Sequence, residues 1–300
     1  MYAMRAFTYG RVVLLLLALT AAGCHSQRAA TVSPQEGERS QLDFKNFDEI
    51  TCKAPVDLFI SQGETFLVEV EVLDQEASDR LEFKMHEREF IIKEEKASWW
   101  SGQRAKGPIA NIYITLPRLE ELSLASAGNA KLMTPFTTSK AFEISIAGSG
   151  SLTGTQVRCA GEAEFSVAGS GSVDIAQLDA HSFEADIAGS GEVSVSTLAC
   201  SGELEGNIAG SGRIALGNCR AQKADFSIGG SGDAHVETLV ASGTVEVDIV
   251  GSGNVKFGEL AARRFTVSSM GSGDVYVDKL QEGTQVSQSR AGSGTLRIGR

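Results

Sequence analysis

Serine and acidic side chains recur at fixed spacing along this chain of 300 residues, and both residue types act as nucleophiles, bases or metal ligands. A serine nucleophile needs a base within hydrogen-bond reach, but none of the four histidines occupies a repeated position. We therefore expect the serines to be turn residues. They are the central residues of eight Gly-Ser-Gly motifs: Ser149, Ser170, Ser190, Ser211, Ser231, Ser252, Ser272 and Ser293.

Acidic residues form a second series, five positions before a Gly-Ser-Gly motif: Glu143, Glu164, Glu184, Glu205, Asp225 and Glu246. Calcium prefers such oxygen ligands, but the calcium-binding nonapeptide repeat of β-rolls carries an aspartate in each turn. Here only Asp233 and Asp274 directly follow a motif. The series favours a solvated acidic surface, with cation binding as the alternative, and we expect no metal site.

Four cysteines follow residue 24, and the repeat register argues against disulfides between them. Cys159 and Cys200 lie at the same position two repeats apart. That is about 9–10 Å for strands stacked at ~4.8 Å, beyond the ~7 Å that a disulfide spans between Cα atoms. We expect free, buried thiols, with a Cys200–Cys219 bridge as the alternative. No Cys-x-x-Cys, His-Glu-x-x-His or helix-opening Gly-x-Gly-x-x-Gly motif occurs, so no cofactor is indicated.

One aromatic pair, Trp99-Trp100, lies between Lys96 and Arg104 in a polar segment. Tryptophan rings can stack on sugar rings, so Trp99 and Trp100 are candidate ligand contacts. Packing against a neighbouring strand is the interpretation that we favour.

Residues 1–23 have the features of an export signal, with Arg5 and Arg11 before an apolar run at 12–19. The run is shorter than the ~20 residues that span a bilayer. Ala21-Ala22-Gly23-Cys24 resembles the bacterial lipobox, with Ala21 where leucine is usual. The resemblance implies lipidation of Cys24, with acyl chains such as palmitate. The residue after the cysteine is His25 and not an aspartate. By the same resemblance, this implies sorting of the lipoprotein to the outer membrane. An ordinary secretory signal is the alternative.

Residues 24–40 have almost no apolar content and no period, which predicts a flexible tether. Without the two arginines of the leader, the formal charge changes from −11 to −13. Nucleic-acid binding requires a basic surface. The composition therefore argues against DNA or RNA as a partner.

The Gly-Ser-Gly motifs define a repeat that predicts the fold. Their second glycines lie at positions 150, 171, 191, 212, 232, 253, 273 and 294. Apolar residues around each motif alternate with period two, as in strands, and not with the period of a helix. A propeller blade needs about 40 residues. Units this short must stack to bury an apolar face, which predicts an all-β parallel β-helix (solenoid) of about 21 residues per coil.

Each unit is expected to contain a strand, a glycine corner, a second strand and a short connector with a buried leucine. Residues 41–121 are strand-like without the repeat, which predicts an irregular β part that caps the N-terminal end, with one short helix at 74–82. We assign 122–300 to the β-helix. In the last unit Gln288 and Arg290 replace inward apolar residues, which favours a capping coil over a docking surface.

Several motifs resemble the head GIN domain family, described as an auto-transporter adhesin. They are FKNFDEI at 44–50, ISQG at 60–63, IYITLP at 112–117, LEEL at 119–122 and the iterated Gly-Ser-Gly, so the resemblance covers 42–300. It implies a right-handed β-helix in an exported bacterial protein and supplies no catalytic residues. Many relatives have Gly-Ala-Gly where this chain has Gly-Ser-Gly.

Two classes of function fit these observations, and fold alone does not choose between them. The first is a lipid-anchored, non-enzymatic β-helix of the cell envelope that binds a glycan or protein surface, as an adhesin does. The second is a β-helix lyase or hydrolase that cleaves polysaccharide. Such enzymes need clustered catalytic groups, usually on long loops. The connectors here are short and nearly constant in length, so the sequence favours the first class.

Overall fold

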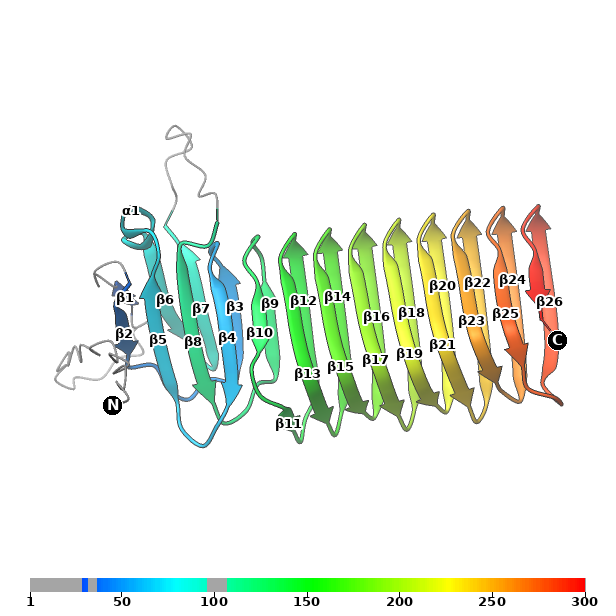
Figure 1. Ribbon diagram of the computed structural model, residues 1–300, viewed down its shortest axis with the longest axis horizontal. Helices are drawn as coiled ribbons and strands as arrows, with labels where there is room; N and C mark the ends of the chain where they lie inside the picture. The colour runs from blue at the N-terminus through cyan, green and yellow to red at the C-terminus, as the bar shows by residue number, and fades with distance from the viewer. Residues whose placement is uncertain (1–28, 32–36, 96–106, 300) are drawn as a thin grey trace, which may run out of the picture.

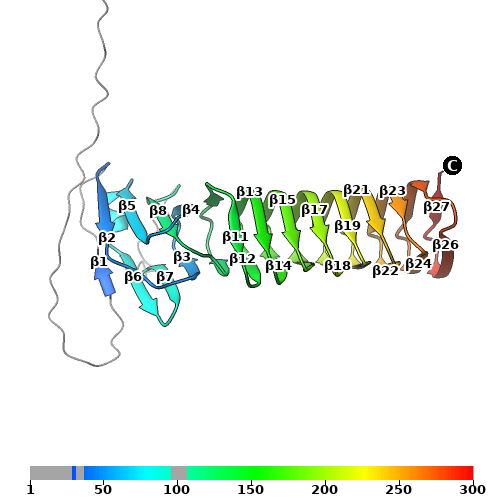
Figure 2. The same ribbon diagram turned by 90° about the horizontal axis from the view of Figure 1, so that it is seen from below.

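Every strand of the repeat region pairs in parallel with the equivalent strand of the next repeat. In this computed structural model, which describes residues 29–31, 37–95 and 107–299, the strands form one sheet of 13 strands and one of 14. Each coil contributes one strand to each sheet, and successive coils advance in a right-handed sense along the long axis (Figure 1 and Figure 2). The predicted parallel β-helix is confirmed.

The two sheets divide the repeat strands by their order in the chain. The 13-stranded sheet takes β12 (Phe142–Gly148), β14 (Glu162–Gly169), β16 (Ser182–Gly189), β18 (Glu203–Gly210), β20 (Lys223–Gly230), β22 (Thr244–Gly251), β24 (Arg264–Gly271) and β26 (Gln285–Gly292). The 14-stranded sheet takes β13 (Ser151–Cys159), β15 (Ser172–Ala180), β17 (Glu192–Cys200), β19 (Arg213–Ala221), β21 (Asp233–Ala241), β23 (Asn254–Ala261), β25 (Val275–Leu280) and β27 (Leu296–Ile298).

The two glycines of each corner are needed for different reasons. Gly210 has a φ of +132°, a conformation that glycine adopts and other residues rarely do. At Gly212 a Cβ atom would lie 2.4 Å from Cγ2 of Ile187 in the preceding coil. Between them the N–H of Ser211 donates to the carbonyl oxygen of Gly189 at 2.8 Å. The backbone ladder therefore continues around the corner, and the serine side chain is exposed.

In the four consecutive coils of β14 to β20, the inward positions of the 13-stranded sheet pair a large residue with a small one. Phe165 stands two residues after Ala163, whereas in the next coil Phe183 precedes Ala185. All four are buried, and the rings of Phe165 and Phe183 meet edge to face with centroids 5.1 Å apart. The second position, four residues before each motif, was not among the predicted interior columns. Its size varies too widely, from phenylalanine to the glycine at 206, to form a visible pattern.

The connector predicted after the second strand is itself strand. β15 runs without a break from Ser172 to Ala180, and Ile175 and Leu178 both face inward. Between them Ala176 drops out of the pairing with β13 and β17, while its neighbours stay paired. This break in the pairing shifts the alternation by one residue, which is why Ile175 and Leu178 can both face inward.

The N-terminal part contains coils whose order along the axis differs from their order in the chain. β3 lies between β7 and β9 in one sheet, and β4 lies between β8 and β10 in the other. Further from the repeat, β5 pairs antiparallel with β8, and β6 pairs antiparallel with β7. The predicted short helix is α1 (Gln75–Ser78). The strands are β3 (Glu49–Lys53), β4 (Asp57–Gln62), β5 (Leu67–Val72), β6 (Leu81–His86), β7 (Glu89–Glu94), β8 (Ala110–Leu116), β9 (Glu121–Leu124), β10 (Ala130–Leu132) and β11 (Phe136–Thr138).

Two pieces of the segment predicted as a tether are strands. β1 (Ala29–Thr31) pairs antiparallel with β6, and β2 (Arg39–Leu42) pairs antiparallel with β5. They cover backbone groups that would otherwise be free at the sheet edges. The leader, Cys24 and the Trp99-Trp100 pair lie outside the described residues. In the described ranges no helix has the length and apolar character needed to cross a membrane.

The four cysteines of the described chain are free thiols, as predicted, and all are buried. Burial raises the pKa of Cys52 to about 11 and that of Cys219 to about 12. Thiols with such pKa values carry little thiolate near neutral pH and are poor nucleophiles.

The coil that contains β26 differs from those before it. Its side chains are exposed, including Gln288 and Arg290 at positions that are apolar in earlier coils. Arg290 donates to the carbonyl oxygen of Gly294 at 3.2 Å. The polar residues expected to form a capping coil thus lie on a strand that pairs only with β24 among the described residues.

Replacing a corner glycine should destabilise the solenoid, and a glycine outside the corner provides the control. Gly210→Ala should lower the free energy of unfolding by about 2 kcal/mol, since it forces a φ of +132° on alanine and places Cβ 2.4 Å from the Gly189 oxygen. Gly229→Ala should be neutral or stabilising by up to ~1 kcal/mol, because its nearest neighbour would be 3.7 Å away. Urea unfolding of both variants measures this, and equal losses would contradict the role of the corner.

Candidate functional site

The outer faces of the two sheets differ in charge. Over six consecutive coils, β12 to β22 of the 13-stranded sheet carry ten carboxylates and one lysine. The matching strands of the 14-stranded sheet, β13 to β23, carry six carboxylates and four lysines or arginines. The negative charge of the repeat region is therefore concentrated on the face of the 13-stranded sheet.

The acidic series predicted from the sequence forms a continuous column on this face. Each member pairs in register with the next, as Glu164 does with Glu143 and Glu184. The column also extends into the N-terminal part through Glu121, Glu49 and Glu89. Those residues precede the Gly-Ser-Gly repeat, so spacing alone could not reveal them. We call the set the acidic column: Glu89, Glu49, Glu121, Glu143, Glu164, Glu184, Glu205, Asp225 and Glu246.

Burial and the crowding of like charges raise the pKa of several carboxyls in the acidic column. Burial, followed by repulsion from Asp186 and Glu205, raises the pKa of Glu184 to about 7. Burial and neighbouring carboxylates also raise the pKa of Glu143 and Asp225. Among the described residues no ion pair reaches Glu184. The column is thus short of compensating positive charge.

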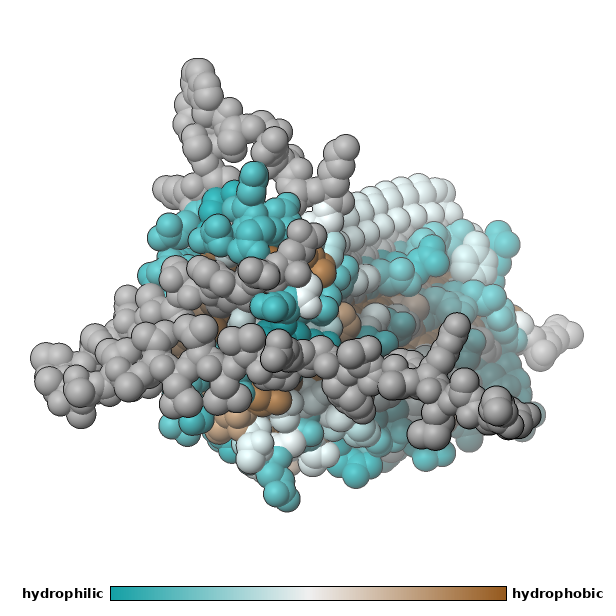
Figure 3. All heavy atoms as spheres, turned by 60° about the vertical axis from the view of Figure 1, so that its left-hand side comes forward, coloured by the Kyte–Doolittle hydropathy of each residue, from teal (hydrophilic) through white to brown (hydrophobic). Residues whose placement is uncertain are grey.

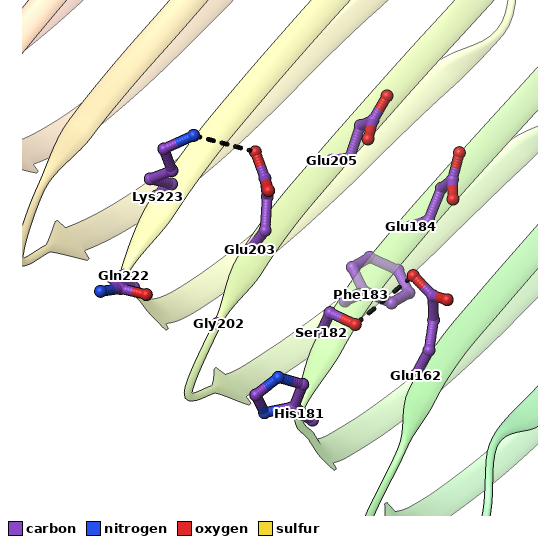
Figure 4. Close-up of a pocket in the computed structure, with 10 residues that line it drawn as sticks. All are labelled: Glu162, His181, Ser182, Phe183, Glu184, Gly202, Glu203, Glu205, Gln222 and Lys223. Carbon is purple, nitrogen blue, oxygen red and sulfur yellow. Dashed lines mark hydrogen bonds and ion pairs between the residues drawn. The ribbon is translucent and has the colours of Figure 1, made fainter.

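A hollow of about 370 Å³ opens beside the column between β14 and β20 (Figure 4). Four carboxylates project around it, and a lysine of β20 reaches one of them, with Lys223 Nζ 3.7 Å from Glu203 Oε1. Ser182 donates to Glu162 Oε1 at 3.4 Å. The hollow therefore presents mostly hydrogen-bond acceptors. Its lining residues are Glu162, His181, Ser182, Phe183, Glu184, Gly202, Glu203, Glu205, Gln222 and Lys223.

A serine–histidine contact lies at the turn next to this hollow. Nδ1 of His181 is 3.0 Å from Oγ of Ser201, and both side chains are exposed. The sequence did not indicate this pair, because Ser201 lies outside the Gly-Ser-Gly motifs. A catalytic serine–histidine pair also needs a third group that orients the histidine. In the described chain no carboxylate hydrogen-bonds to His181. The geometry indicates a turn contact.

A second depression, of about 540 Å³, lies on the same face near the Gly-Ser-Gly corners. Its floor is a row of small outward residues, and its rim is a row of serine, aspartate and asparagine. We call it the small-residue groove. The floor holds Ala168, Ala188, Ala209, Gly229 and Val250, and the rim holds Ser145, Ser166, Asp186, Asn207, Ser227 and Asp248. In Figure 3 bands of similar colour run along the solenoid, as expected where outward residues repeat from coil to coil.

The rim of the groove and the acidic column are linked by hydrogen bonds. The side-chain amide of Asn207 donates to Asp186 Oδ1 at 3.0 Å and to Glu205 Oε1 at 2.9 Å. Within the described chain no group of three or more His, Cys, Asp or Glu side chains has the geometry of a metal site. The face is thus an extended polar surface with carboxylates along one side and small residues along the other.

Stability should depend on pH through the acidic column. The pKa of Glu184 is raised from 4.5 to about 7, so between these values the folded chain holds a proton that the unfolded chain has lost. The free energy of unfolding must then fall as the pH rises through this window. We expect a loss of about 1 kcal/mol from this group between about pH 5 and pH 8, after discounting for solvent screening.

Urea titrations of Glu184→Gln at the two pH values measure this contribution, which the substitution should remove. The matched control is Glu192→Gln on the opposite sheet, where Arg213 is the paired neighbour. The control should keep the full pH difference. A Glu184→Gln chain that kept it too would contradict the electrostatic account of the column.

Solved structures with this architecture cover most of the chain. A "Putative lipid binding protein" of Parabacteroides distasonis has a TM-score of 0.64 and 22% identity, and the match covers 89% of this chain and 98% of that one. A "putative adhesin" of the same organism has a TM-score of 0.56 and 18% identity, over 91% and 97%. A "putative adhesin" of Parabacteroides merdae has a TM-score of 0.50 and 17% identity, over 93% and 98%. At these identities the likeness shows the fold. No curated protein matches the chain.

The family model described as "Putative auto-transporter adhesin, head GIN domain" matches residues 46–258. This range includes the N-terminal coils and the repeat as far as β23. It confirms the resemblance that the sequence motifs indicated. The chain therefore belongs to the head GIN domain family.

Proposed function

We propose that the chain is a non-enzymatic adhesin of the cell envelope, anchored through lipid on Cys24, that contacts its partner with the face of the 13-stranded sheet. The observation that carries the proposal is the in-register repetition of this face. From β12 to β22 the same outward positions recur in every coil. A surface of this kind offers many equal contacts to an extended partner and suits multivalent binding.

The chemistry of the face supports binding over catalysis. A hydrolase needs an acid and a base held in one cleft around the scissile bond. Here the carboxylates are spread evenly along the solenoid, and the turns between consecutive repeat strands are short. The raised pKa of Glu184 follows from burial and the neighbouring acids of the column.

The lipid in this proposal is attached at the N-terminus and does not fill the solenoid. One structural neighbour is named a lipid-binding protein. In this chain the interior of the coils is occupied by stacked side chains such as Phe165, Phe183 and Phe226, each at most 1% exposed. Several acyl chains at Cys24 would hold the protein firmly, since one chain alone binds a membrane only marginally.

Removing the anchoring residue should release the protein and abolish attachment of the cells. We expect Cys24→Ala to move the chain from the membrane to the soluble fraction, because its acyl chains are then missing. Cells carrying this variant should lose attachment to the surface that wild-type cells bind. The matched control is Ser26→Ala, which leaves the lipidated residue in place. Fractionation and an attachment assay measure the two effects.

Two results would contradict the proposed function. One is a Cys24→Ala chain that stays in the membrane fraction, or cells that attach without the anchored chain. The other is the appearance of new reducing or unsaturated ends when the purified chain is incubated with a panel of polysaccharides, which would show turnover.

A further inference from the structure

The small-residue groove runs along the solenoid axis and crosses five coils. Its floor residues are Ala168, Ala188, Ala209, Gly229 and Val250, one from each coil. At the far end the floor residue is Val250, whose side chain is larger than those of the other four and is 60% exposed. This makes the groove shallower at that end. The groove is therefore an open channel perpendicular to the strands, and an occupant that fills it must be long and thin.

The backbone of the sheet limits the kind of occupant. Floor strands such as β16 and β18 are paired on both sides, so an added peptide strand finds no free backbone groups. The groove offers one set of contacts per coil, about every 4.8 Å, whereas the side chains on one face of an extended peptide repeat about every 6.6–6.8 Å. A pyranose residue of an extended β-1,4-linked polysaccharide advances by nearly the inter-coil distance. The spacing favours a sugar chain.

The charges of the face limit the occupant further. Across the six coils this face carries ten carboxylates and only one lysine. This excess of negative charge disfavours binding of an anionic polysaccharide and favours binding of a cationic one. Asn207 already gives both of its amide hydrogens to Asp186 and Glu205. The remaining capacity of the rim is mostly carboxylate and hydroxyl oxygen, which accepts hydrogen bonds. Hydroxyl and ammonium groups are the donors that match it.

We propose that the groove binds a linear amino-sugar polysaccharide, a β-1,4-linked glucosamine chain that lies along the solenoid axis. Its rings rest on the floor at Ala168, Ala188 and Ala209. Because successive residues of such a chain turn opposite edges outward, the ammonium groups of every second residue face the rim and the acidic column. The inference rests on the proposed function and deepens it, because it names the partner and the contact surface of the adhesin.

The test is calorimetric titration of the full chain with a glucosamine hexamer at low ionic strength. We expect saturable binding, and at least tenfold weaker binding of the N-acetylated hexamer and of polygalacturonate. Raising the floor by the double substitution Ala188→Val and Ala209→Val should weaken binding at least tenfold. Val250 shows that the row accepts a branched side chain without a change of fold. The double substitution Glu184→Gln and Glu205→Gln should weaken binding and reduce its salt dependence.

A matched control lies on the other sheet. Ala199→Val changes an outward row of the 14-stranded sheet that already holds Val240, which is 46% exposed, and should bind as the wild type does. Absence of binding to the glucosamine hexamer would overturn the inference. So would unchanged binding by the floor variant, or equally tight binding of a lysine hexamer, which would indicate general attraction to acid. Cells that attach while the hexamer fails to bind would leave the proposed function intact and remove only this inference.

Discussion

The close approach of successive backbones at the glycine corners sets the geometry of the whole solenoid. From the second Gly-Ser-Gly motif onward, the serine N–H donates to a glycine carbonyl of the preceding coil at 2.8–2.9 Å. A Cβ atom on Gly212 would lie within 2.4 Å of the preceding coil, so glycine is required for this approach. Because the ladder passes around the corner unbroken, the paired strand residues of one coil lie over their equivalents in the next. The two sheets, the filled interior and the ordered outer faces all follow from this register.

The same register that stabilises the interior creates the electrostatic character of the surface. Inside, stacking of like positions buries aromatic and aliphatic side chains, and a large residue in one column is offset by a small one in its neighbour, as Phe183 is by Ala185. Outside, stacking places carboxylates over one another, and burial together with repulsion from Asp186 and Glu205 raises the pKa of Glu184 to about 7. The apolar burial inside the coils must offset this repulsion for the chain to stay folded. The chain then presents an acidic face short of positive charge beside a groove with a floor of small residues.

The sequence predicted those features that depend on strict repetition. The coil length, the glycine corners and the acidic series from Glu143 to Glu246 follow from a period of about 21 residues. The buried free thiols also follow, because Cys159 and Cys200 occupy repeated inward positions.

Features set by packing between coils were missed. The second interior column varies from Phe165 to the glycine at 206, and the break at Ala176 is visible only in the pairing. The N-terminal coils could not be ordered, since β3 and β4 come first in the chain but lie inside the stack. For the same reason Glu49 and Glu89 were not assigned to the acidic column.

Amide hydrogen exchange at the corner serines tests this account most directly. If coil stacking continues through the corner, the N–H groups of Ser190, Ser211 and Ser231, each 2.8 Å from a glycine oxygen, should exchange as slowly as those of the adjoining strands. Turn amides open to solvent would exchange faster by orders of magnitude. Protection equal to that of the strands is the result we predict. Fast exchange confined to these serines would show that the corners are loose, and the register on which the acidic column and the groove depend would then lack its physical basis.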